Sequence, residues 1–256
     1  MKETDFFWFK GMKVDNPSYL EAVARIDANI EKTGYVCFVE AVSIVLGHID
    51  SELMTALNNS IMSLPDGMPL VWYGRLLGIR KIERLSGPEV FRDFIERHAE
   101  YKHFLLGDTP ETIRQVISKA TAGNRSLRIS GYSPPFRPEL TEQDNAIILN
   151  IISRANPDII WVSFGLVKQA KWMYKIAPRL ERGIMMGVGA AFKFYTGAIP
   201  QLPRFVQLMG LNWVSRIADR PEFFFRNIRN RIKFLCYFPG EFIQARIRGR
   251  GRGGRD

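Results

Sequence analysis

Short apolar segments alternate with amphipathic helical segments along residues 1–200, and this alternation limits the fold more than any other feature of the chain. We predict strands at 35–39, 62–64, 103–106, 127–130, 159–164 and 184–187. Helical patterns stand between them, including 18–31, 40–60, 86–101, 141–154 and 168–180. Strands and helices that alternate in this way favour an α/β fold with a mainly parallel sheet flanked by helices.

Helix-start signals support these boundaries. A Ser or Thr followed three residues later by an acid occurs at 18–21, 86–89 and 141–144, which is the spacing of a capping box. Pro88 falls near the first position of the helix that we predict from residue 86, where the fixed φ of proline suits a helix. We therefore expect each of these acids to cap the helix that it begins.

Asp66 lies in a tight turn, Leu64-Pro65-Asp66-Gly67-Met68, between a predicted strand and a predicted helix. Ligands of parallel sheets bind at the carboxyl ends of strands, so this carboxylate stands where a catalytic base would act on a substrate hydroxyl. Asp is also a favoured helix cap, and the local pattern alone favours capping. Gly107 and Gly165 follow other predicted strands, Gly187 ends another, and all three fall at the same edge.

The charge of the chain is concentrated near its end. The sequence carries a net charge of +10, and from residue 204 onward it has twelve basic and four acidic residues. A basic region of this kind attracts phosphate, whether in nucleic acid, in anionic lipid or in a diphosphate substrate.

Signals for export and for metal binding are missing from the sequence. No apolar run approaches the roughly 20 residues that span a bilayer, and residues 1–5 do not resemble a signal peptide. Two cysteines, Cys37 and Cys236, make neither a disulfide framework nor a zinc site. The three histidines have no Cys or carboxylate partners at ligand spacing. We expect a cytoplasmic protein with no metal and no cofactor.

The character of the chain changes after residue 200, where predicted strands stop. We divide the chain into a sheet domain (1–200), a basic helical appendage (201–245) and a flexible Arg/Gly tail (246–256). The tail resembles RNA-binding segments, but it is short and has no companion RNA motif, so nucleic acid is not an expected partner.

Within the appendage, residues 221–235 form an amphipathic helical pattern. Its apolar face consists of Phe224, Ile228, Ile232 and Leu235. Such a helix lies on a membrane surface with the apolar face down, or it packs as an ordinary surface helix on the sheet domain. The pattern leaves both interpretations open.

Motifs at 64–72, 84–88, 164–169, 187–192 and 210–216 stand in one order along the chain. In their order and in their residues they resemble the motifs of the WecG/TagA/CpsF family of bacterial glycosyltransferases. The resemblance runs from about Gly34 to about Arg226, and its most specific parts are Asp-Gly-Met-Pro at 66–69 and Gly-Val-Gly-Ala-Ala-Phe at 187–192.

This resemblance implies a Rossmann-like fold with a C-terminal appendage that reaches the membrane. It implies an inverting enzyme that moves a hexose or an N-acetylhexosamine, often N-acetylmannosamine, from a UDP-sugar to a polyprenyl-diphosphate-linked sugar. Such reactions build exopolysaccharides and cell-wall polymers on the inner face of the plasma membrane. Family members that work without a metal fit the lack of an Asp-x-Asp pair here. A homo-oligomer is compatible with the sequence.

The resemblance also assigns charged residues to the reaction. Asp66 matches the proposed general base. Arg84 matches an arginine that stabilises charge on the leaving diphosphate, although a surface ion pair would also explain it. Arg216 matches an appendage arginine expected near the lipid diphosphate, with a solvated charge as the alternative.

Other matches imply a nucleotide pocket. Gln169 matches a polar pocket residue, and a helix-surface glutamine is the alternative. Gly187, Val188 and Gly189 match a loop whose glycines let the backbone approach the nucleotide, and a tight turn is the alternative.

The chain departs from the family pattern in the pocket. Phe38 and Glu40 replace a Thr-x-Asn pair, Ala170 and Lys193 replace acids, and Asn212 replaces another acid. These changes leave the donor sugar open. They also support a second hypothesis, a non-catalytic sugar-nucleotide-binding or scaffold protein of the same fold with a degenerate pocket.

Overall fold

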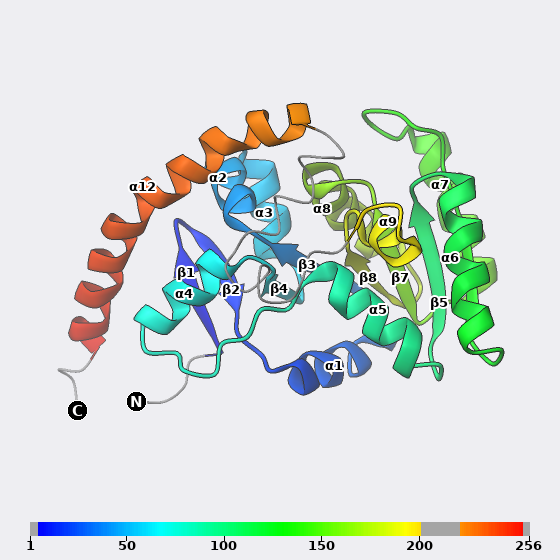
Figure 1. Ribbon diagram of the computed structural model, residues 1–256, viewed down its shortest axis with the longest axis horizontal. Helices are drawn as coiled ribbons and strands as arrows, with labels where there is room; N and C mark the ends of the chain where they lie inside the picture. Colours follow the sequence, from blue (N-terminus) through cyan, green and yellow to red (C-terminus); the bar gives the residue numbers. More distant parts are fainter. Residues whose placement is uncertain (1–4, 201–220, 253–256) are drawn as a thin grey trace.

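The computed structural model describes residues 5–200 and 221–252, with the side chains of the last helix described at 228–247 (Figure 1). Its centre is a six-stranded sheet with strand order β4-β3-β8-β7-β5-β6, in which every pairing is parallel. The strands are β3 (Gly34–Val39), β4 (Met62–Pro65), β5 (Lys102–Gly107), β6 (Arg128–Tyr132), β7 (Ile159–Ser163) and β8 (Ile184–Gly187). The predicted strands and the predicted α/β fold are confirmed.

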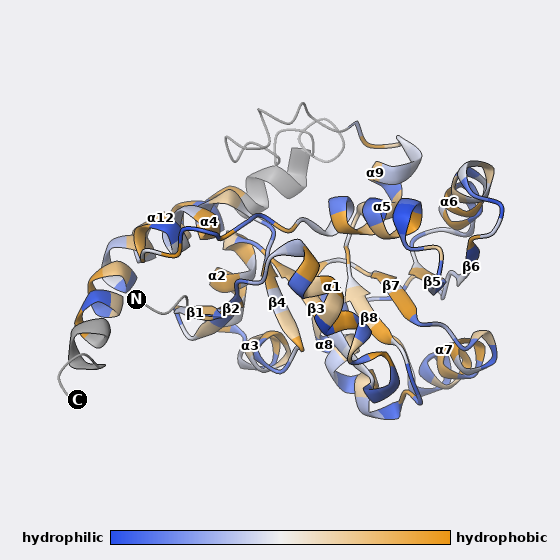
Figure 2. Ribbon diagram, turned by 90° about the horizontal axis from the view of Figure 1, so that it is seen from below, coloured by the Kyte–Doolittle hydropathy of each residue, from blue (hydrophilic) through white to orange (hydrophobic). Residues whose placement is uncertain are grey.

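Helices cover both faces of this sheet (Figure 2). One face carries α2 (Ala41–Ile49), α3 (Ser51–Asn58), α7 (Glu142–Ala155) and α8 (Leu166–Ile176), with a 3₁₀ turn at Ala177–Arg179. The other face carries α1 (Tyr19–Asp27), α5 (Gly87–Arg97), α6 (Pro110–Gly123) and α9 (Ala191–Thr196), with a 3₁₀ turn at Ile30–Lys32. Successive residues of β3 enter the two clusters in turn, which is why central strands read as continuous apolar runs.

The helix boundaries correct one prediction and confirm others. The predicted helical stretch 40–60 is two helices, α2 and α3, which meet at Asp50. The Asp50 carboxylate accepts the Leu53 N–H at 3.0 Å and caps α3. The capping boxes predicted at 18–21 and 141–144 are both present.

An N-terminal hairpin is an element that the sequence analysis missed. Strands β1 (Phe6–Phe9) and β2 (Met12–Asp15) pair antiparallel through a turn in which Lys10 and Gly11 both have positive φ. Phe7 and Phe9 point into the core, whereas Phe6 and Trp8 are exposed. Helix α4 (Met68–Leu76) packs on the inner face of this hairpin, where the rings of Phe9 and Tyr73 lie 4.6 Å apart.

The last helix, α12 (Pro221–Arg252), passes over α2 and the hairpin (Figure 1). Phe234, only 1% exposed, stacks on Phe9 at 4.8 Å, and the ring of Phe238 lies 5.2 Å from that of Tyr73. The helix predicted at 221–235 is therefore present, but it continues through Arg252, beyond the position at which we predicted a flexible tail. No helix in the described part of the chain combines the length and apolarity that a membrane span requires.

The outer side of α12 is also apolar. Large side chains on this side remain exposed: Ile228, Ile232, Leu235, Ile243 and Ile247. The helix therefore has two apolar faces, and the described residues of the predicted face, Ile228, Ile232 and Leu235, are the exposed ones.

Candidate functional site

The carboxyl edge of the sheet divides around β8. β8 leads into α9 on one face, whereas its neighbours β3 and β7 lead into α2 and α8 on the opposite face. Ligands of open α/β sheets bind outside the strand ends at a point where the chain segments diverge in this way. The sequence-predicted residues that the structure describes gather at this edge.

Asp66 directly follows β4. Its backbone N–H donates to the Val39 carbonyl at 2.9 Å, which joins the ends of β3 and β4. The N-cap of α4 is Gly67, so Asp66 stands one residue before the N-cap position. Its side chain is 28% exposed, with Oδ1 3.6 Å from Nη1 of Arg84. The carboxylate is thus held at the strand end, beside a guanidinium, with part of its surface open.

Arg84 is held against the same strand end. The adjacent Leu85 N–H donates to the Pro65 carbonyl at 3.0 Å. The Arg84 side chain is only 7% exposed, and its Nη2 lies 2.6 Å from Oε1 of Glu89. A surface ion pair therefore does not describe it: the guanidinium is buried between two carboxylates, with a charge-assisted hydrogen bond to Glu89 and a longer ion pair to Asp66.

Glu89 is the functional candidate that the sequence analysis missed. Ser86 is the N-cap of α5, as predicted, but its side chain makes no capping hydrogen bond. The Glu89 carboxylate meets Arg84 instead. Its spacing from Ser86 fits a capping box, so the only local signal pointed to a different role.

Gln169 is buried, so the surface-glutamine alternative is wrong. Its Nε2 donates to the Gly187 carbonyl at 2.8 Å, and its Oε1 accepts the Gly189 N–H at 3.2 Å. Ser163 Oγ donates to the Gly189 carbonyl at 2.6 Å. Both ends of the Gln169 amide therefore hold the loop that follows β8.

The glycines of this loop serve different needs. A Cβ at Gly187 would lie 2.7 Å from Met173 Cε and 3.0 Å from Gln169 Nε2, so this glycine lets α8 approach β8. Gly189 has φ +56, a conformation that glycine adopts easily, and a Cβ there would meet nothing within 4 Å. Val188 is buried, and a Cβ at Gly87 would lie 3.4 Å from its Cα, so the loop touches the start of α5.

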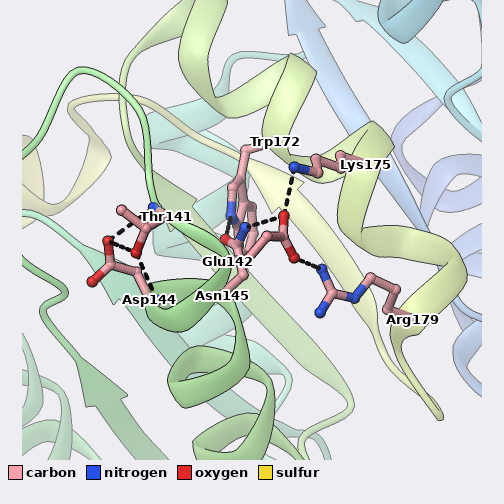
Figure 3. Close-up of polar contacts among 7 residues, drawn as sticks. All are labelled: Thr141, Glu142, Asp144, Asn145, Trp172, Lys175 and Arg179. Carbon is pink, nitrogen blue, oxygen red and sulfur yellow. Dashed lines mark hydrogen bonds and ion pairs between the residues drawn. The ribbon is translucent and has the colours of Figure 1, made fainter.

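Polar contacts between α7 and α8 fix the helix that carries Gln169 (Figure 3). Glu142 accepts from Lys175 Nζ at 2.6 Å and from Arg179 Nη1 at 2.9 Å. These hydrogen bonds lower the pKa of Glu142 to about 2. The buried Trp172 Nε1 donates to Asn145 Oδ1 at 2.9 Å. α8 is thus tied to α7 at both buried and exposed positions.

The positions that depart from the family pattern differ in their surroundings. Phe38 and Ala170 are buried in the clusters on opposite faces of the sheet. Glu40 is half-buried and directly follows β3, and a Cβ added at Gly67 would lie 3.4 Å from the Cβ of Glu40. Lys193 is half-buried on α9. The start of the Glu40 side chain thus lies next to the Asp66 turn.

The remaining predicted residue, Arg216, lies outside the described residues, as does Asn212. Within the ranges 5–200 and 221–252, His, Cys, Asp and Glu side chains form no group of three that could hold a metal ion. The role of Arg216 and the expectation that no metal is needed stay predictions.

A separate groove of about 410 Å³ lies between the hairpin, α2 and α12. Trp8, Lys10, His48 and Glu241 line it. Lys10 N–H donates to Glu241 Oε2 at 3.0 Å, and the ammonium is 3.8 Å from Oε1 of the same carboxylate. The contacts between Lys10 and Glu241 join the hairpin to α12. The groove lies at this junction and is not part of the carboxyl edge.

Comparison with known proteins decides the family. The model of the glycosyl transferase WecG/TagA/CpsF family matches residues 7–249. The chain belongs to this family. The resemblance noted in the sequence is confirmed, and the parallel sheet described above is the Rossmann-like fold that it implied.

Two curated relatives of this WecG/TagA/CpsF protein carry the same name, N-acetylglucosaminyldiphosphoundecaprenol N-acetyl-beta-D-mannosaminyltransferase. The protein from Bacillus subtilis is 27% identical over 174 residues, 67% of this chain and 66% of the relative. The protein from Bacillus spizizenii is 23% identical over 167 residues, 64% of this chain and 63% of the relative. The chain thus matches slightly less than two thirds of the length of each.

Proposed function

We propose that this protein is an inverting glycosyltransferase that moves a hexose or N-acetylhexosamine from a UDP-sugar to a polyprenyl-diphosphate-linked sugar. The pathway class is exopolysaccharide or cell-wall polymer biosynthesis. The observation that carries the proposal is the part-exposed Asp66 carboxylate, held at the carboxyl edge of the sheet beside the buried Arg84. Family membership and the relatives' printed acceptor, N-acetylglucosaminyldiphosphoundecaprenol, support it.

In this proposal Asp66 is the general base. It takes the proton of the acceptor hydroxyl while that oxygen attacks the anomeric carbon of the donor. The bond from the anomeric carbon to the diphosphate breaks with inversion, and UDP leaves with the electron pair. A base matters here because a neutral hydroxyl is a much weaker nucleophile than the oxygen left when its proton is removed.

The other residues bind charge or shape the pocket. Arg84, oriented by Glu89, stabilises negative charge on the leaving diphosphate. Arg216 meets the diphosphate of the lipid acceptor. Gln169 acts indirectly, because its amide holds the Gly187–Gly189 loop against which the nucleotide lies.

We further propose that the protein is peripheral on the inner face of the plasma membrane, with the outer face of α12 in the lipid interface. Ile232, Leu235 and Ile243 are 56%, 61% and 58% exposed, although Phe234 on the opposite face is buried. A second apolar face left in solvent favours the membrane interpretation over an ordinary surface helix. Arg229 and Arg246 are exposed on the same helix and suit anionic headgroups.

The test of the catalytic proposal is UDP release from a panel of UDP-sugars in the presence of a lipid-diphosphate acceptor. We expect Asp66→Asn to lower turnover at least about 100-fold while the circular dichroism spectrum is unchanged. Glu111→Gln, which neutralises an exposed carboxylate on α6, is the matched control and should keep full turnover. Unchanged turnover in Asp66→Asn would overturn the assignment of the base.

A second candidate is a non-catalytic sugar-nucleotide-binding protein of the same fold. The buried Phe38 and Ala170, at positions where the family pattern has polar residues, favour it. UDP that binds without acceptor-dependent release from any UDP-sugar of the panel would support this candidate over the enzyme.

A further inference from the structure

The outer face of α4 carries large apolar side chains in solvent. Trp72 is 42% exposed and Leu76 is 51% exposed. Four residues apart on a helix, they share one face. The inner face is occupied by Leu70, Val71 and Tyr73, all at most 1% exposed, so α4 is firmly packed while its outer pair remains uncovered.

Positive charge surrounds this pair. Arg75 lies between Trp72 and Leu76 along the helix and is exposed, and the turn that follows α4 exposes Arg80 and Lys81. Residues 67–82 contain no acid. An indole and an aliphatic side chain bordered by Arg and Lys suit the interface of an anionic bilayer, because the apolar groups enter the headgroup region and the cations meet lipid phosphate.

The position of α4 links this patch to the site and to α12. The helix begins at Met68, directly after Asp66 and Gly67, so the Asp66 carboxylate stands at its N-terminal end. Its inner face contacts α12, since the rings of Tyr73 and Phe238 lie 5.2 Å apart (the two helices run close together in Figure 2).

We propose that the outer face of α4, formed by Trp72, Leu76 and Arg75, is a second membrane contact that binds an anionic lipid surface. The proposal rests on the proposed peripheral function, in which the outer face of α12 is the first contact. One amphipathic helix can roll about its axis on a membrane. Two contacts on different elements fix the orientation of the protein and hold the Asp66 edge at the depth of lipid-linked diphosphate.

The experiment measures binding to vesicles of phosphatidylglycerol and phosphatidylcholine by sedimentation. We expect the double variant Trp72→Ser, Leu76→Ser to bind about tenfold more weakly than the wild type. Leu20→Ser, Ile147→Ser is the matched control: it removes exposed apolar side chains from α1 and α7 and should bind like the wild type. Each pair includes at least one side chain that is only about half exposed, so both variants should lose a small and similar amount of stability, and binding is compared at a temperature well below both unfolding midpoints.

A charge substitution tests the same contact independently. Arg75→Glu should weaken binding to phosphatidylglycerol vesicles, and the difference from the wild type should shrink in high salt and on vesicles of phosphatidylcholine alone. Wild-type binding by both the double variant and Arg75→Glu would overturn the proposal. A wild-type dimer that the double variant dissociates, with vesicle binding unchanged, would overturn it in favour of an interface between copies of this chain.

Vesicle binding needs no sugar transfer, so the two proposals fail separately. If the double variant lost vesicle binding, the α4 contact would be supported even if the wild type released no UDP from any donor. The absence of UDP release would overturn only the proposed glycosyltransferase activity. The α12 contact is tested apart by Ile232→Ser, Leu235→Ser, which changes exposed residues of that helix alone.

Discussion

The carboxyl edge of the sheet and the α12 attachment are held by different kinds of contact. At the edge, backbone hydrogen bonds from Asp66 and Leu85 join β3, β4 and the Arg84 segment, and Gln169 clamps the loop after β8. α12 instead packs through rings, with Phe234 on Phe9 and Phe238 on Tyr73. Hydrogen bonds are directional and place atoms precisely enough for chemistry, whereas ring packing mainly removes apolar area from water.

This difference separates two tasks within one chain. The edge has to hold a carboxylate and a guanidinium in fixed relation, and Arg84 is accordingly buried between Glu89 and Asp66. α12 is attached along one face, and apolar side chains of its other face, such as Ile232 and Leu235, are exposed. Substitutions in the two regions should therefore change different properties.

The largest effect on stability is expected from Phe234→Ala. Removing a fully buried ring from the α12 attachment should cost about 3 kcal/mol, measured by denaturant unfolding or, if α12 detaches first, by hydrogen exchange of its amides. Its neighbour provides the control: Leu235→Ala, at a position 61% exposed, should change stability by less than about 0.5 kcal/mol. Equal effects at the two positions would mean that α12 does not pack through Phe234.

A smaller effect, on activity, is expected from Glu89→Gln. The variant removes the charged partner 2.6 Å from Arg84 Nη2, so the guanidinium loses part of its orientation. We expect turnover to fall about tenfold with little change in KM, because oriented charge counts most as the leaving diphosphate develops. Glu89→Asp should recover part of the lost turnover. Glu83→Gln, at an exposed position next to Arg84, is the control and should keep the wild-type turnover. A change confined to the unfolding midpoint would reduce Glu89 to a structural role.

Much of the sheet could be predicted because its signals are local. β3, β7 and β8 are buried on both faces, so they read as short apolar runs. Thr141 and Asp144 form a capping box within four consecutive residues. Such features do not depend on what the rest of the chain does.

The site and the attachments depend on contacts between distant segments. Glu89 has the spacing of a capping residue, and only the approach of Arg84 gives it another role. The sequence shows that α12 is apolar at both Ile232 and Phe234, but which of them packs is decided by the hairpin, which the sequence analysis missed. Gln169 gave no local sign that it would be buried, because its partners, Gly187 and Gly189, lie eighteen and twenty residues later in the chain.

The smallest effect is expected at the contact between α7 and α8, which supports the edge from outside. Hydrogen bonds from Lys175 and Arg179 lower the pKa of Glu142 from 4.5 to about 2 in the folded protein. A lowered folded pKa means that the contribution to stability is complete above the unfolded value and is lost as pH falls from about 4.5 toward 2. Glu142→Gln should therefore lower the unfolding midpoint slightly at pH 7, and this difference should shrink toward pH 3. Glu181→Gln, at another exposed carboxylate, controls for general charge. Because Glu142 is itself largely exposed, solvent screens its ion pairs and their contribution to stability should be small. A large difference in unfolding midpoint at pH 7 would contradict this expectation.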